Sequence, residues 1–270
     1  MITIKSNREI ELLRIAGNIV YKTHQYLRPF LKPGITTQEI DDLADKYIRS
    51  QDATPSCKGY QGFPAAICIS VNDEVVHGIA GPRKLKDGDI VTLDICACYK
   101  GYHGDSAWSY EIGKVDEEKS HLMKYTEKAL FVGLNEVKPG NRIGDIGHAI
   151  YEYSTKHNLG VVRELCGHGV GSNLHEDPEV PNYGTPNTGP RLKPGMVIAV
   201  EPMLTAKSPR IEILDDDWTV ITEDGHPAAH FEHTVLVTKD GYEILTGEWK
   251  DGKRRYNWSW RKGSRNHSGW

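Results

Sequence analysis

The sequence predicts a mixed α/β fold made of two related halves, and three observations support this. The segment 85–94 is matched by the segment 192–201, and both segments end in an acidic residue. A Lys-Pro-Gly turn occurs at 32–34 and again at 138–140, with nearly the same separation. The hydrophobic pattern of each half indicates a helix, this turn, a second helix and then a buried strand. A constant offset between two matched pairs indicates a duplicated unit.

In the first half, apolar residues at helical spacing predict a helix over 10–26, which Pro29 ends. A second helix begins near 36–37, where Thr36 or Thr37 can act as its cap, and continues through Ile48. Alternating patterns and turn residues predict strands over 64–71, 90–99 and 105–112, the last two forming a hairpin around Lys100-Gly101.

The second half repeats the helix pair and adds more strands. Helices are predicted over 117–137 and 143–157, and the segment 182–192, rich in Gly, Pro and Asn, is predicted to be a loop. Strands are predicted over 197–204, 218–222 and 230–238.

Composition limits the class of protein. The chain has 270 residues, 38% apolar and 26% charged, as in a globular enzyme or binding protein. A net charge of −4 argues against a dedicated DNA- or RNA-binding protein, and the chain has no apolar run long enough to span a membrane. The charged start, without an apolar signal segment, and five cysteines without zinc-finger spacing predict a cytoplasmic protein with reduced thiols.

The sequence predicts one domain over 1–246 and a basic, Trp-rich tail over 247–270. The tail has seven Lys or Arg residues, two acidic residues and four of the six tryptophans. It could lie on the surface as an extension, or it could contact RNA or the ribosome through stacking and phosphate attraction.

Two acids of the predicted hairpin, Asp94 and Asp105, indicate a cation site. Because side chains alternate along a strand, Asp94 faces away from the core residues Leu93 and Ile95. A turn at Tyr99-Lys100 would place Asp94 directly opposite Asp105, where two charges shielded from water would repel each other. A bound divalent cation removes this cost. The alternative is a pair of solvated acids on a surface hairpin.

The second half contributes further donors. Glu201 ends the repeated segment, and Glu232 lies in an otherwise apolar strand. His168, flanked by glycines in 166–171, would be structural if it stood alone, but beside the carboxylates it is the candidate nitrogen ligand. Four carboxylates balance two divalent ions, and this donor set suits Mn, Fe, Co or Zn. A water between two such ions would be acidified into a nucleophile.

These residues lie in motifs that resemble those of the type I methionine aminopeptidases of bacterial type, from about Ile10 to Leu245. The motifs are Asp94 with Asp105 and the segments 72–79, 167–171, 175–178, 201–203 and 231–234. The resemblance implies the pita-bread fold, with two pseudo-symmetric halves around a dinuclear metal site. It also implies removal of the initiator methionine from nascent polypeptides when the second residue is small.

The resemblance also implies roles for individual residues. One ion would be held by Asp94, Asp105 and Glu232, and the other by Asp105, His168, Glu201 and Glu232. Glu201 would move the proton, while His77 and His175 would contact the substrate near the scissile bond. From the residues alone, each of these two histidines could instead be structural, His77 in a turn before Gly78 and His175 paired with neighbouring acids.

The implied methionine pocket combines sulfur, aromatic and apolar side chains, namely Cys57, Tyr60, Phe63, Cys68, Leu174 and Trp218. By composition alone these are ordinary core residues, although such a surface suits a thioether. Leu174 stands where many relatives have an aromatic residue, so we expect a somewhat wider pocket.

Two other functions are compatible with the same fold. A catalytically weak relative could act as a ribosome- or RNA-binding factor through its tail, but the presence of all five implied metal ligands favours an enzyme. A proline-directed aminopeptidase would usually have an additional N-terminal domain, and a type II enzyme would have an insertion between His175 and Glu201. The short start and short spacing favour the bacterial type I enzyme, which we expect to be a monomer.

Overall fold

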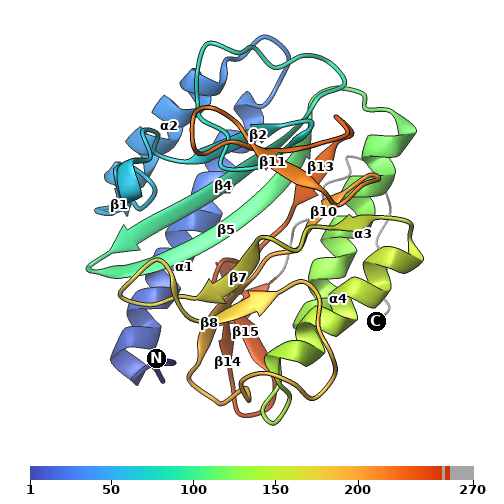
Figure 1. Cartoon of the computed structure of the whole chain (residues 1–270). Helices are drawn as coiled ribbons and strands as arrows, with labels where there is room; N and C mark the ends of the chain where they lie inside the picture. Colours follow the sequence, from blue (N-terminus) through green and yellow to red (C-terminus); the bar gives the residue numbers. More distant parts are fainter. Residues whose placement is uncertain (251–252, 256–270) are drawn as a thin grey trace.

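The computed structural model describes residues 1–250 and 253–255 of the chain. The first half has the helices α1 (Asn7–Leu27) and α2 (Thr37–Ser50), and short 3-10 turns at Arg28–Phe30 and Tyr60–Gly62. Figure 1 shows α1, in blue, behind the long hairpin of β4 (Ile90–Tyr99) and β5 (Tyr102–Glu111).

Side-chain caps set the helix starts. The Ser6 hydroxyl accepts from the Glu9 N–H and the Glu9 carboxylate accepts from the Ser6 N–H, which begins α1. Thr36 and Glu39 form the same capping box at α2, so Thr36 is the cap. These reciprocal bonds satisfy donors that the first helical turn leaves unpaired.

The first sheet consists of β1 (Thr54–Pro55), β4, β2 (Cys68–Val71) and β5, which pairs with β4. Lys100 and Gly101, with φ of 49° and 81°, form a two-residue turn closed by the pair Tyr99 and Tyr102.

The predicted pairing of Asp94 with Asp105 is therefore wrong. Asp94 pairs with Ala107, and Asp105 pairs with Cys96. The turn lies one residue later than this pairing requires, which shifts each partner by two positions. Because the shift is even, both acids keep the predicted face of the hairpin.

The second half has the helices α3 (Glu117–Leu134) and α4 (Ile143–Lys156), drawn in green in Figure 1. Its five-stranded sheet has the order β15 (Tyr242–Ile244), β14 (His233–Val237), β9 (Val197–Val200), β7 (Cys166–Gly169) and β8 (Glu176–Pro181). Two small sheets are formed by β13 (Ala228–His230), β10 (Met203–Thr205) and β6 (Gly160–Val161), and by β11 (Ile211–Ile213), β12 (Val220–Thr222) and β3 (Glu74–Val76). The short strands β16 (Glu248–Lys250) and β17 (Lys253–Arg255) pair with each other.

The predicted strands 197–204 and 230–238 are each interrupted. The break between β9 and β10 contains Glu201 and Pro202, and Pro202 has no N–H to donate to a ladder. The break between β13 and β14 lies beside it, at Phe231 and Glu232. The register is the same on both sides of the breaks, since Val200 pairs with His233 and Met203 pairs with His230. Continued across the gap, this register places Glu201 opposite Glu232.

The duplication is visible in the backbone. An isolated bridge joins Thr36 to Lys84 in the first half, and an equivalent bridge joins Arg142 to Arg191 in the second. Both Lys-Pro-Gly turns end in a left-handed glycine, Gly34 at φ 97° and Gly140 at φ 96°. Each of these glycines donates its N–H to the first residue of the repeated segment, Leu85 or Leu192. This confirms the two-halved fold.

Hydrogen bonds and apolar packing join the halves next to the four acids. The Glu232 N–H donates to the carbonyl of Ala107 at 2.8 Å, and the Ser106 hydroxyl donates to the carbonyl of Glu232 at 2.6 Å. The ring of Trp108 packs edge-on against Phe231, with centroids 5.0 Å apart. The seam between the halves is therefore held by β5.

In residues 1–250 and 253–255, no helix combines the length and the apolar character that crossing a bilayer requires. Most of the predicted basic tail, at 251–252 and 256–270, lies outside the described residues. Its separation from the domain 1–246 stays a prediction.

A buried histidine fixes α1 against β5. His24 donates from Nε2 to the carbonyl of Ser106 at 3.0 Å, so its Nδ1 accepts from the Tyr110 hydroxyl at 2.8 Å. Burial lowers the pKa of His24 from 6.5 to about 4. Between these values the unfolded chain binds the extra proton, so the free energy of unfolding falls as the pH falls from 6.5 to 4.

We expect His24 to account for about 3 kcal/mol of this loss. His24→Gln should therefore flatten the decrease in unfolding free energy between pH 6.5 and 4, measured by urea denaturation at several pH values. His121→Gln, at an exposed position on α3, is the control and should keep the wild-type slope. Equal slopes for the wild type and His24→Gln would contradict the assignment.

Candidate metal centre and substrate pocket

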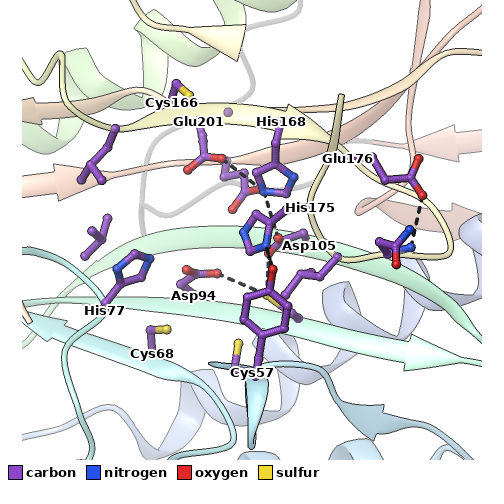
Figure 2. Close-up of a pocket in the computed structure, with 18 of the residues that line it drawn as sticks. Cys57, Cys68, His77, Asp94, Asp105, Cys166, His168, His175, Glu176 and Glu201 are labelled. Carbon is purple, nitrogen blue, oxygen red and sulfur yellow. Dashed lines mark hydrogen bonds and ion pairs between the residues drawn. The ribbon is translucent and has the colours of Figure 1, made fainter. Parts of the chain in front are cut away.

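Every residue that the sequence analysis proposed for the site lines one cavity of about 850 Å³. Figure 2 shows several of these side chains converging on it from both halves. The proposed residues on its wall are Cys57, Tyr60, Phe63, Cys68, His77, Asp94, Asp105, His168, Leu174, His175, Glu201, Trp218 and Glu232.

The first-half acids are linked by a thiol. Asp94 on β4 and Asp105 on β5 share one face of the hairpin, and Cys96 lies on the same face. The Cys96 thiol donates to Asp105 Oδ1 at 2.8 Å and lies 3.8 Å from Asp94 Oδ1. Cys96 thus holds the Asp105 carboxylate in place, a role that the sequence analysis missed.

The second-half acids occupy the two strand breaks, where backbone groups lose their ladder partners. Side chains replace some of these partners: Asn182 Nδ2 donates to the Glu201 carbonyl at 3.0 Å. Glu232 is anchored by its backbone bonds to β5. Both carboxylates are buried and lie on the cavity wall.

His168 points its free nitrogen at these acids. Its Nδ1 donates to the carbonyl of Gly169 at 2.9 Å, which leaves a lone pair on Nε2. Nε2 lies 3.6 Å from Asp105 Oδ2 and 3.6 Å from Glu201 Oε1. A Cβ at Gly169 would collide with the carbonyl of Asp177 on β8, so the flanking glycine permits the close strand approach that aims this ring.

Crowding changes the proton affinity of the carboxylates. Burial raises the pKa of Asp105 to about 8 and that of Glu201 to about 7. The pKa values of Asp94 and Glu232 rise further, first through burial and then through the charge of Asp105. Among the described residues, Glu232 Oε1 is buried without a hydrogen-bond partner. A buried acceptor of this kind, among oxygen and nitrogen donors, fits a divalent transition metal.

Two histidines lie at the side of this cluster. His175 Nδ1 is 2.8 Å from the Tyr60 hydroxyl, and its ring centroid is 4.2 Å from that of His168. His77 adopts a left-handed backbone, with φ of 59°, which is uncommon for a residue with a side chain. Such conformations persist where the surrounding structure fixes them, and they cluster at functional sites.

An apolar pocket adjoins the acids. Cys57, Phe63, Cys68 and Leu174 are buried in one cluster, and Tyr60 and Trp218 pack against it. Cys68 on β2 pairs directly with Asp94 on β4, so the wall of the pocket is one strand away from a proposed ligand.

His230 is a residue of the cavity wall that the sequence analysis did not propose. It ends β13 two positions before Glu232, and its Nε2 lies 3.4 Å from Glu201 Oε2. The sequence could have indicated this position, because His230 and Glu232 are two residues apart and such residues share a face of an extended chain. No motif drew attention to it.

Comparison with known proteins agrees with this arrangement. The profile of metallopeptidase family M24 matches residues 11–239. Methionine aminopeptidase 1 of Bacillus subtilis is 53% identical over 246 residues, which cover 91% of this chain and 99% of that protein.

Solved structures show the same likeness. Methionine aminopeptidase from Thermotoga maritima has a TM-score of 0.90 and 42% identity, over 92% of this chain and 100% of that one. An Xaa-Pro dipeptidase from Bacillus anthracis has a TM-score of 0.75 and 26% identity, and the match covers only 63% of that chain. This chain therefore belongs to metallopeptidase family M24 and, within it, to the methionine aminopeptidases.

Proposed function

We propose that this protein removes the initiator methionine from nascent polypeptides whose second residue is small, with two divalent metal ions. The observation that carries the proposal is the meeting of four carboxylates and His168 beside a sulfur- and aromatic-lined pocket. The proposal places the enzyme in the cytoplasm, as a monomer that meets new chains near the ribosome.

The proposed metal ligands are Asp94, Asp105, His168, Glu201 and Glu232. Asp105 and Glu232 are each proposed to bind both ions, because each belongs to two groups of candidate ligands. Asp105 lies close to Asp94 and also to His168, and Glu232 lies close to His168 and also to Glu201. When bound, divalent ions such as Co, Mn, Fe or Zn would polarise the scissile carbonyl and make a water more acidic.

The apolar cluster is proposed to bind the methionine side chain. Cys57, Cys68 and Leu174 would contact the thioether, and Phe63 and Trp218, with ring centroids 5.1 Å apart, would close its aromatic side. Leu174 is smaller than an aromatic residue, so the pocket should accept side chains somewhat bulkier than methionine.

Glu201 is proposed to accept a proton from water and to pass it to the leaving amine. Its buried carboxylate lines the cavity, where a general base for this reaction has to lie. His175, oriented by the Tyr60 hydroxyl, is proposed to hydrogen-bond the scissile carbonyl oxygen as charge develops there. His77, which lies across Asp94 from His175 in Figure 2, is proposed to contact the substrate near the scissile bond.

Peptide turnover tests the function. We expect metal-supplemented protein to release methionine from Met-Gly-Met, to release it slowly from Met-Leu-Met, and to leave Ala-Pro-Met intact. Chelation should abolish turnover, and added Co or Mn should restore it. Cleavage of Ala-Pro-Met in preference to Met-Gly-Met would instead support a proline-directed peptidase.

The metal assignment has its own test. Asp105→Asn should lower kcat/KM by at least about 100-fold, the upper range for residues that only support a ligand. Asp45→Asn removes the same charge from the outer side of α2 and should keep wild-type turnover. Full activity in Asp105→Asn would exclude the proposed ligand set.

Tyr60→Phe isolates the orienting bond to His175. Its loss should lower kcat for Met-Gly-Met about fivefold, since one hydrogen bond contributes about 1 kcal/mol, while KM changes little because the ring stays in the pocket. Tyr153→Phe on α4 is the matched control. A change in KM alone would show that the hydroxyl binds substrate and does not orient His175.

A further inference from the structure

His230 is a buried imidazole that makes no hydrogen bond through its ring within the described part of the chain. Its side chain lines the cavity, and the residue is 2% exposed. Among the described residues, neither Nδ1 nor Nε2 has a hydrogen-bond partner. Leaving such polar atoms buried and unsatisfied is unfavourable, so the position calls for a ligand.

The backbone of His230 is fixed on both sides. It pairs with Met203 on β10, and the Ser109 hydroxyl lies 3.1 Å from both its N–H and its carbonyl. The alternation along this segment puts the side chains of His230 and Glu232 on the same face. The ring is therefore held toward the acids.

The distances match those between neighbouring metal ligands. His230 Nε2 lies 3.4 Å from Glu201 Oε2, and one donor atom each from Glu201, His230 and Glu232 lie within 4.8 Å of one another. Ligands bound at about 2.1 Å in a tetrahedral site lie about 3.4 Å apart. The 3.6 Å separations of His168 from Asp105 and Glu201 are similar.

We propose that His230 is an additional metal ligand, whose Nε2 binds a divalent transition-metal ion together with Glu201 and Glu232. The centre then offers two imidazoles among its carboxylates. Nitrogen ligands favour zinc, cobalt or iron over manganese and magnesium, so His230 biases the centre toward the first group. The inference rests on the proposed metal centre but not on peptide cleavage.

A hydrogen bond from His230 to Glu201 is the competing explanation. The contact of His230 Nε2 with Glu201 Oε2 does not meet hydrogen-bond geometry in this structure. In that case His230 would only position Glu201.

Anomalous diffraction from wild-type crystals soaked in Zn²⁺ or Co²⁺ separates the two. We expect an ion within about 2.3 Å of His230 Nε2 and in contact with Glu201 and Glu232. An ion held by Glu201 and Glu232 with Nε2 more than about 3 Å away would overturn the proposal, as would no ion at these residues.

Calorimetry on the metal-stripped protein gives an independent test without substrate. His230→Gln should raise the Kd for Zn²⁺ at least tenfold and that for Mn²⁺ less than threefold, and it should change the visible spectrum of the Co²⁺ form. His24→Gln makes the same substitution at a buried histidine outside the cavity and should leave all three unchanged at pH 7.5. Equal losses for Zn²⁺ and Mn²⁺, or an unchanged spectrum, would overturn the proposal.

The two proposals fail separately. If His230 contacts the ion but Met-Gly-Met is not cleaved, the peptidase function is wrong and the ligand assignment stands. If cleavage occurs and the crystal shows Nε2 away from every ion, the ligand assignment is wrong. Should His230→Gln not fold, the wild-type crystals decide.

Discussion

Repulsion among four crowded carboxylates is the constraint on which the rest of this structure depends. Asp105, Glu201 and Glu232 are buried together, and Asp94 is only partly exposed to the cavity. Leaving such charges uncompensated costs several kcal/mol, so the cluster must bind protons or cations. The raised pKa values of Asp105 and Glu201 show that the cluster favours proton binding when no cation is present. The hydrogen bonds between Glu232 and β5 keep the acids from moving apart. The electrostatic repulsion among them therefore persists until a proton or a cation is bound.

Duplication explains how one chain assembles such a site, but the two halves position their acids differently. The first half presents its acids from an unbroken hairpin, where they sit diagonally and Cys96 lies between them. In the second half the acids face each other across interrupted strands, a direct opposition that a regular ladder would penalise. Interruption frees the backbone there and lets the Asn182 and Ser106 side chains supply the bonds. The second half can therefore open its acids toward the cavity and toward His230.

Local signals in the sequence predicted the helices, a cap at Thr36 or Thr37, the hairpin and the repeat, because each depends on neighbouring residues. Alternation along the strands also put the acids on the correct face. The pairing of Asp94 failed because it depends on which two residues form the turn, and a one-residue error shifts every partner by two. The breaks at Pro202 and Phe231 were missed because both flanks are apolar and look like one strand. His230 was missed because no motif contained it.

The proposed methionine pocket and the proposed metal centre are connected through β4. Cys68, in the wall of the proposed methionine pocket, pairs with Asp94, and the partner strand of β4 carries Asp105. Protein interiors are close-packed, so a displacement of β2 by a larger pocket residue passes to Asp94. Changes that widen or fill the pocket on this wall should therefore alter metal affinity as well as substrate choice. Leu174 lies in the loop between β7 and β8 and joins the same cluster by side-chain packing, so its size does not act on Asp94 through a strand pair.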